Sequence, residues 1–108
     1  MLKLPFAIRY DPAVRGHLAF IERNHHSFIR AAIKEQLSHE PGVTTRSRKP
    51  LRRSNRLVLE RAWELRCGPD NRFRVFYRLD EEAREVLVVA IGIKEGSRLF
   101  VGGEETSP

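Results

Sequence analysis

The stretch that most constrains the fold is residues 63–77, with the sequence WELRCGPDNRFRVFY. Side chains alternate in character on both sides of the turn-forming residues 68–71. Because successive side chains of a strand point to opposite faces of a sheet, the stretch predicts a β-hairpin. Its apolar face would carry Trp63, Leu65, Cys67, Phe73, Val75 and Tyr77. Its other face, extended by one residue, would carry Glu64, Arg66, Arg72, Arg74, Phe76 and Arg78.

Charge is concentrated around this hairpin. The chain has 108 residues, the size of a single domain spanning residues 1–108, and a net charge of +6. Residues 46–78 hold eleven cationic side chains, ten of them arginine, against three acidic ones, so this third of the chain carries all of the excess. Arginine makes planar, bidentate contacts with phosphate, so the patch predicts a nucleic-acid partner. A solvated loop is the alternative for residues 46–56.

The N-terminal half predicts a strand followed by two helices. Alternating apolar residues over 4–10 indicate a strand, and Asp11 followed by Pro12 is a helix-start signal. Val14, Leu18 and Ile21 then form one helical stripe. A second helix, capped by Ser27, would bury its own stripe of Ile29, Ile33 and Leu37. The two helices would pack on a sheet as a hairpin.

The C-terminal half predicts the rest of that sheet. Residues 43–58 lack a clean period and indicate a basic loop, with a short strand near 57–59. The apolar run 85–94 indicates a central strand buried on both faces. In strict alternation, Leu87, Val89, Ile91 and Ile93 would share one face, and Val86, Val88, Ala90, Gly92 and Lys94 the other. Ala90 and Gly92 would then leave a shallow groove beside the arginines, and residues 102–108 would form a frayed tail. The predicted fold class is α+β: an N-terminal strand, a two-helix hairpin and a three-strand antiparallel meander in one sheet.

Several function classes receive no support from the residues. No segment is long and apolar enough for a membrane span or a signal peptide, and one cysteine cannot form an intrachain disulfide, so we expect a cytoplasmic protein without membrane contact. His17, His25 and His26 lack a further ligand at a suitable spacing, so we expect no metal and no cofactor. Cys67 is interpreted as buried filler rather than a nucleophile.

Four segments together resemble the RelE/ParE superfamily of bacterial type II toxin–antitoxin toxins. They are Lys49-Pro50-Leu51, Trp63-Glu64-Leu65-Arg66, Arg72-Phe73-Arg74-Val75-Phe76-Tyr77 and Ala90-Ile91-Gly92-Ile93-Lys94. The likeness spans about residues 3–100. It implies a helical hairpin packed on a mainly antiparallel sheet, a cognate antitoxin as partner, and a growth-inhibiting toxin. In the RelE and HigB branches the activity is mRNA cleavage, mostly on the ribosome, whereas the ParE branch inhibits DNA gyrase.

The favoured expectation is a metal-independent endoribonuclease (an mRNA interferase) in which the ribose 2′-hydroxyl of the RNA attacks the neighbouring phosphate. By the resemblance, Arg74 would stabilise transition-state charge, Arg66 would support the same phosphate and Lys94 would favour departure of the leaving oxygen. Glu64 would be either the general base or an ion-pair partner that holds the arginines apart. RNA contacts are expected from Lys49, Arg52, Arg53, Arg56, Arg72, Arg78 and Phe76, with Phe76 stacking on a base unless a helix or loop covers it.

Two departures from the family pattern keep other functions open. Phe100 stands where RelE-type nucleases often carry a tyrosine, and no histidine lies beyond His39. A ParE-like gyrase inhibitor without nuclease activity, or an inactive member that only binds its antitoxin, are therefore alternatives.

Overall fold

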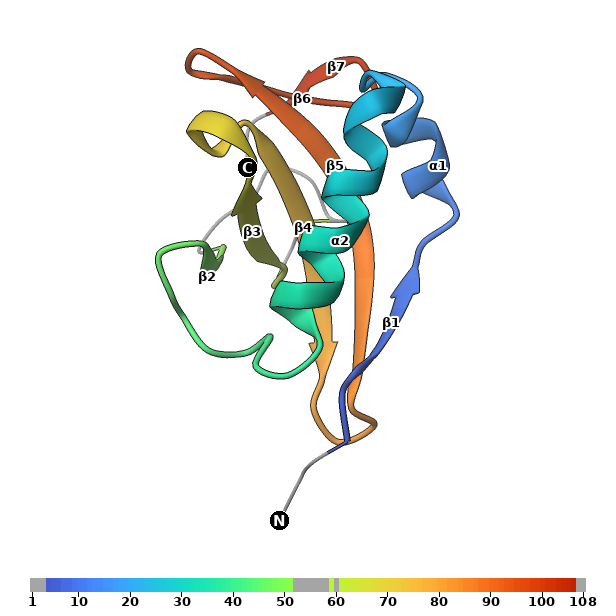
Figure 1. The fold of residues 1–108 in the computed structure, drawn as a ribbon, viewed down its shortest axis with the longest axis vertical. Coiled ribbons are helices and arrows are strands. Elements are labelled where there is room, and N and C mark those ends of the chain that lie inside the picture. The colour runs from blue at the N-terminus through green and yellow to red at the C-terminus, as the bar shows by residue number, and fades with distance from the viewer. Residues whose placement is uncertain (1–3, 52–58, 60, 107–108) are drawn as a thin grey trace.

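A computed structural model describes residues 4–51, 59 and 61–106 of the chain. Its strands form one seven-stranded sheet in the order β2-β3-β4-β5-β6-β7, and β1 pairs with β5 outside this path (Figure 1). The strands are β1 (Ala7–Tyr10), β2 (Arg48–Pro50), β3 (Trp63–Cys67), β4 (Phe73–Asp80), β5 (Glu85–Glu95), β6 (Arg98–Val101) and β7 (Glu104–Thr106). The helices are α1 (Ala13–Leu18) and α2 (His26–Leu37), with 3-10 turns η1 (Arg23–His25) and η3 (Pro69–Asn71).

The α+β class is as predicted, but the sheet is larger than a three-strand meander. Strands β2, β6 and β7 were not predicted, and β7 occupies part of what was expected to be a frayed tail. Each of these strands has only three or four residues, so its own alternation is too short to be recognised, and pairing with a neighbour defines it. The strand expected near 57–59 falls largely outside the described residues.

The helices also differ from the prediction at their ends. Helix α1 stops at Leu18, so Ile21 is buried from the turn that follows rather than from the helix. Helix α2 starts at His26 and has no side-chain cap hydrogen bond, so the predicted cap at Ser27 is wrong. Instead, the His26 ring is 2.8 Å from the carbonyl oxygen of Ile21 and ties the helix start to the preceding turn. The N-cap of α1 is Pro12 rather than Asp11, but the Asp11 carboxylate still accepts a hydrogen bond from the amide of Ala13 at the helix start.

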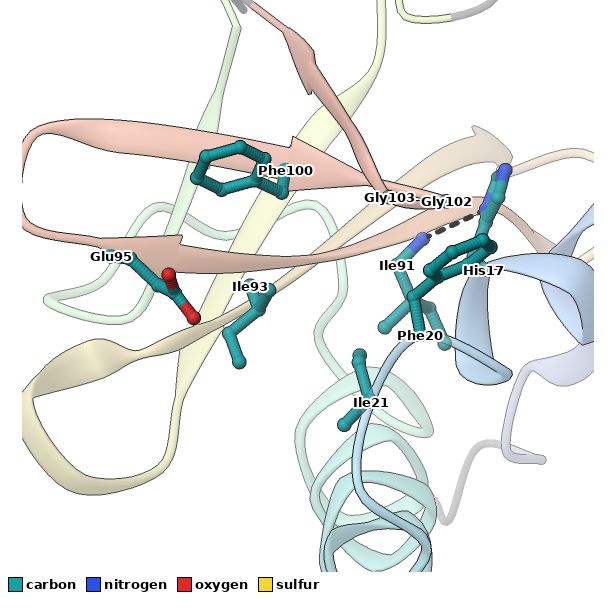
Figure 2. Close-up of a pocket in the computed structure, with 9 residues that line it drawn as sticks. All are labelled: His17, Phe20, Ile21, Ile91, Ile93, Glu95, Phe100, Gly102 and Gly103. Atoms are coloured by element: carbon teal, nitrogen blue, oxygen red, sulfur yellow. Dashed lines mark hydrogen bonds between the residues drawn. The ribbon is translucent and has the colours of Figure 1, made fainter.

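One edge of β5 is shared by two strands that do not meet. Strand β1 pairs in parallel with the 85–88 part of β5, and β6 pairs antiparallel with the 92–95 part. Between them, His17 Nδ1 accepts a hydrogen bond of 3.3 Å from the amide of Ile91 (Figure 2). A side chain of α1 thereby satisfies a backbone donor that neither strand reaches.

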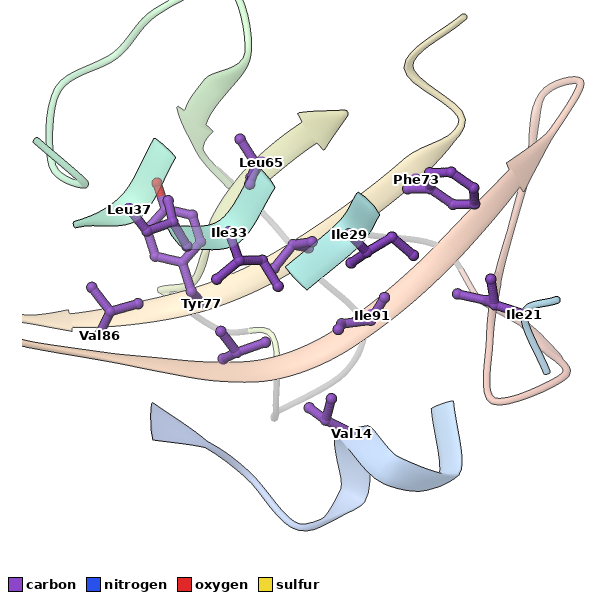
Figure 3. Packing of buried hydrophobic residues seen from close by; sticks show 12 residues of the cluster. Val14, Ile21, Ile29, Ile33, Leu37, Leu65, Phe73, Tyr77, Val86 and Ile91 are labelled. Carbon is purple, nitrogen blue, oxygen red and sulfur yellow. The ribbon is translucent and has the colours of Figure 1, made fainter. Parts of the chain in front are cut away.

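The main core lies between the helices and the sheet (Figure 3). The predicted stripe of Ile29, Ile33 and Leu37 is buried, as are Phe73 and Tyr77 of the hairpin's apolar face. The Tyr77 hydroxyl donates a hydrogen bond of 2.8 Å to the carbonyl of Pro41, and burial raises the pKa of this phenol well above its ordinary value. This core fixes which face of β4 points away from the helices.

The central hairpin is confirmed. Strands β3 and β4 pair antiparallel through the turn at 68–71, with Arg66 directly opposite Arg74. Gly68 has a φ of +85°, and a Cβ there would lie 2.6 Å from the Phe73 ring, so both backbone conformation and space favour glycine. The turn thus sets the register that aligns the two arginines.

The predicted alternation of β5 is wrong along half of its length. The register with β4 shifts between Phe76 and Tyr77, which pair with Ala90 and Val88, so Val89 is an extra residue in a β-bulge. Side chains before the bulge therefore change faces relative to strict alternation. Val86 and Val88 join Ile91 in the helix-side core, and Leu87 and Val89 pack on the opposite face.

That opposite face has a smaller core of its own. Phe76, Val89 and Ala90 are buried against Leu59 and Ala62, which precede β3. The same face carries the arginines beyond Phe76, toward the hairpin turn. No helix among the described residues is long and apolar enough to cross a membrane.

Candidate nucleic-acid interface

A row of cationic side chains crosses the sheet face that points away from the helices. Lys49 of β2 lies opposite Glu64 of β3, and Arg66 of β3 lies opposite Arg74 of β4. In β5, Gly92 lies opposite Arg74, and Lys94 lies two residues further on. The sheet pairing thus brings together Arg66, Arg74 and Lys94, which the sequence predicted for this face, and adds Lys49, which was expected in a loop.

Glu64 pairs with three of these four cations. Its side chain is only 3% exposed, and its oxygens lie 3.0 Å from Arg66 Nε, 3.4 Å from an Arg74 guanidinium nitrogen and 4.0 Å from Lys49 Nζ. Like charges directly opposite one another on paired strands repel, so the carboxylate between them offsets that repulsion. These contacts favour the ion-pair role for Glu64 over the general-base role, since both carboxylate oxygens are engaged by cations.

Arg74 is held on two sides. Its Nε donates a hydrogen bond of 2.9 Å to the carbonyl of Asn71 in the hairpin turn, and its guanidinium also contacts Glu64. The side chain is 8% exposed, which is unusual for an arginine. A guanidinium fixed in this way presents its remaining donor surface in one orientation and loses little rotamer freedom on binding an anion.

Two hollows meet at Arg74 and Lys94. One, of about 390 Å³, is also lined by Leu99 and by Ser97, Arg98, Glu105 and Thr106. The other, of about 530 Å³, is lined by His25, Pro69, Asp70, Arg72, Phe73 and Gly96 as well. No acidic side chain of the described residues forms an ion pair with Lys94, whereas Arg74 is anchored. The pair therefore offers one fixed and one adjustable cation at the junction of two hollows.

The groove expected over Ala90 and Gly92 is not open. A Cβ at Gly92 would lie 2.7 Å from the carbonyl oxygen of Phe100 and 2.9 Å from the Val101 side chain. The small residues make room for β6 to approach, and Ala90 is buried under the second core. The open space lies further along, beyond Lys94.

The base-stacking role expected for Phe76 is wrong. Its ring is fully buried with Leu59 and Ala62, so neither ring face is available to a base. The sequence alternation placed Phe76 correctly on the arginine face but could not show that Leu59 and Ala62 cover it.

The remaining predicted RNA contacts divide into three groups. Arg72 lines the larger hollow and pairs with Glu95 at 3.9 Å. Lys49 is exposed at one end of the cationic row, and Arg78 is exposed towards the far end of β4. Arg52, Arg53 and Arg56 lie outside the described residues.

Phe100 lies away from the cationic row. It pairs with Ile93, which packs against the helix-side core, and it lines a third hollow of about 180 Å³ with Ile21 and His17 (Figure 2). A tyrosine hydroxyl at this position would therefore not lie beside Arg74.

Histidine is the functional candidate that the sequence analysis undervalued. The sequence assigned His25 no role beyond the absence of a metal site, yet it lines the same hollow as Arg74 and Lys94. The neighbouring histidines stood out equally in the sequence, and nothing in their spacing distinguished His25. No group of three His, Cys, Asp or Glu side chains in the described part of the chain is arranged to hold a metal ion.

Cys67 follows its predicted role as filler. It packs against the helix-side core, and burial raises the pKa of its thiol to about 11, with the Arg74 charge opposing the shift. A thiol with that pKa is almost wholly protonated at neutral pH and is a poor nucleophile.

Comparison with solved structures identifies the fold. A chain of the crystal structure of the toxin–antitoxin complex RelBE2 from Mycobacterium tuberculosis aligns with a TM-score of 0.67. The alignment covers 86% of this chain and 95% of that chain at 24% sequence identity. This chain has a RelE-like fold. No protein-family model matches the sequence, and no curated protein matches it significantly.

Proposed function

We propose that this chain is a toxin of a type II toxin–antitoxin system, in the RelE/ParE superfamily, and that it inhibits translation by cleaving mRNA on the ribosome. The observation that carries the proposal is the placement of anchored Arg74 beside Lys94, where two hollows meet. An RNA strand passing over this point would place one phosphate at the two cations and a nucleotide on each side.

The reaction would be metal-independent attack by a ribose 2′-oxygen on its own 3′-phosphate. The 2′-oxygen–phosphorus bond forms, the bond from phosphorus to the 5′-oxygen of the next nucleotide breaks, and the products are a 2′,3′-cyclic phosphate and a 5′-hydroxyl. Arg74 would stabilise the charge that builds on the non-bridging oxygens, and Lys94 would stabilise the leaving 5′-oxygen. Glu64 would hold Arg74 in place, and Arg66 would support the same phosphate from the neighbouring strand.

The ribosome and the antitoxin would be the partners. Lys49, Arg72 and Arg78, together with Arg52, Arg53 and Arg56, would contact RNA phosphates, and the ribosome would position the message. A cognate antitoxin would be acidic where it covers this surface and would fold on binding. With these partners the protein would act in the cytoplasm.

A ParE-like gyrase inhibitor is the second candidate. It is favoured by the ion pairs of Glu64, because a carboxylate engaged by three cations is a weak proton acceptor. Glu105 of β7, which lines the smaller hollow, is itself paired with Arg98. A protein-binding inhibitor needs no base.

The test adds purified protein to a translation extract with one defined mRNA and maps new 5′ ends with and without ribosomes. Wild-type protein should generate cuts that need ribosomes, and Arg74→Ala should lower the cleavage rate by about 10²-fold or more, the usual scale for losing one preorganised charge-stabilising group. Arg9→Ala is the matched control, since Arg9 is a strand arginine in an exposed ion pair with Glu85, outside the hollows.

Thermal unfolding of all three proteins separates loss of activity from loss of fold. An intact message combined with inhibited DNA supercoiling by gyrase would replace the nuclease proposal with the ParE-like one. A wild-type protein that neither cleaves mRNA nor inhibits gyrase would instead support an inactive, antitoxin-binding role.

A further inference from the structure

One histidine, His25, lines the larger hollow together with Arg74 and Lys94. His25 ends η1, and the tertiary fold places it against the start of β4, about fifty residues away in the sequence. Its ring lies on the Phe73 ring with a centroid distance of 5.1 Å and an interplanar angle of 50°. Phe73 faces the helix side and Arg74 the other side of the sheet, yet both line the larger hollow, so the imidazole opens onto the same space as the residue that we place at the phosphate.

The strand residues described so far do not supply a general base for the proposed reaction. Removing the 2′-hydroxyl proton needs a base. Glu64 is buried in ion pairs, and Glu105, the strand carboxylate in the smaller hollow, is paired with Arg98. Lys94 and Arg74 are cations and cannot accept a proton at neutral pH. Histidine is the side chain that most often accepts a proton in this role.

We propose that His25 is the general base of the cleavage reaction, an inference that rests on the proposed nuclease function. Its unprotonated ring nitrogen would accept the proton from the 2′-hydroxyl as the 2′-oxygen bonds to phosphorus. The leaving 5′-oxygen, stabilised by Lys94, would take its proton from water. RNA with its scissile phosphate at Arg74 and Lys94 would therefore place the ribose on the 5′ side in the larger hollow.

The other histidines either hydrogen-bond to the backbone or lie at the far end of α2. His17 accepts the amide hydrogen bond of Ile91, and the His26 ring contacts the carbonyl oxygen of Ile21. His39 follows the C-terminal end of α2, a helix of twelve residues and hence about 18 Å long. His25 precedes the other end of that helix and is the histidine that lines a hollow with Arg74.

Charged groups from each neighbouring element face His25. Glu22, just before η1, lies 4.0 Å from its Nε2, and this carboxylate is 78% exposed. Asp70 of η3, Arg72 just before β4 and Lys94 of β5 line the same hollow, with Arg74 at its border to the smaller one. Protonation of His25 would remove the base, so we expect activity to fall on the acid side of the pH profile.

The experiment measures single-turnover cleavage of a defined mRNA on purified ribosomes between pH 5 and 8. The proteins are wild type, His25→Asn, His25→Phe and His39→Asn. His25→Phe keeps an aromatic ring against Phe73 while removing the proton acceptor, so it guards against simple loss of packing. Binding is measured in parallel with the same message carrying 2′-deoxyribose at the cleavage site, which cannot react.

We expect both His25 variants to cleave about 10²-fold or more slowly than wild type, to lose the acid limb of the pH profile, and to bind the 2′-deoxy message within twofold of wild type. His39→Asn should match wild type throughout. If wild type cleaves and either His25 variant retains the rate or the acid limb, the base assignment is wrong and the nuclease function stands. Equal losses of cleavage and binding would show a structural role and also overturn it. If wild type does not cleave, both proposals fail.

Discussion

Replacing Glu64 by glutamine tests whether one buried carboxylate holds the cationic row together. The substitution preserves size and one acceptor oxygen but removes the negative charge. Glu64 is 3% and Arg74 is 8% exposed, so their pair lies where solvent screens it least. Arg66 and Lys49 are 31% and 50% exposed and are better solvated without their partner.

The expected cost follows from these exposures. Removing one partner of a buried ion pair costs about 3–5 kcal/mol, whereas partly exposed pairs contribute about 0–1 kcal/mol each. The Arg74 contact is long, at 3.4 Å, and glutamine retains an acceptor, so the lower end applies. We expect Glu64→Gln to lower the free energy of unfolding by about 3 kcal/mol, a large fraction of the roughly 5–15 kcal/mol typical of a domain.

Urea unfolding at neutral pH measures this cost. Glu95→Gln is the matched control, because Glu95 also pairs with an arginine, Arg72, but is 60% exposed, and it should change stability by no more than about 0.5 kcal/mol. Adding Arg74→Met to Glu64→Gln removes the uncompensated charge and should recover part of the loss. A Glu64→Gln variant as stable as the Glu95→Gln control would refute the reasoning, as would a double variant less stable than Glu64→Gln alone.

Three further predictions follow from local contacts. Gly92→Ala should destabilise the protein by about 1–3 kcal/mol in urea unfolding, because the new Cβ would meet the Phe100 carbonyl at 2.7 Å and the backbone cannot easily yield; unchanged stability would show that β6 shifts freely. His17→Ala should cost about 1–3 kcal/mol by leaving the Ile91 amide without its acceptor, and hydrogen exchange of that amide should accelerate; an unchanged exchange rate would contradict the contact. Cys67, with a thiol pKa of about 11, stays protonated below that pH, so iodoacetamide should modify it far more slowly at pH 7.5 than a free cysteine, and the rate should rise with pH towards 11; a rate equal to that of free cysteine would show that the site opens.

The sequence could predict the hairpin and the cationic face because both depend on local alternation and turn chemistry. The turn at 68–71 sets the register, and that register aligns Arg66 with Arg74. The stripe of α2 was predictable for a similar reason, since a helical period of apolar residues buries one side. The pairing of Arg74 with Gly92 followed once β4 and β5 were paired.

Tertiary structure decided the features that the alternation of side chains along one strand does not encode. The bulge at Val89 moves Val86 and Val88 to the other face, because a bulge depends on how two strands pair and not on either strand alone. Burial of Phe76 depends on Leu59 and Ala62 folding over it. The position of His25 beside Phe73 depends on how α1, η1 and α2 pack on the sheet, a contact between segments far apart in sequence. Local pattern thus determined which residues share a strand face, and long-range packing determined which of them remain open to a ligand.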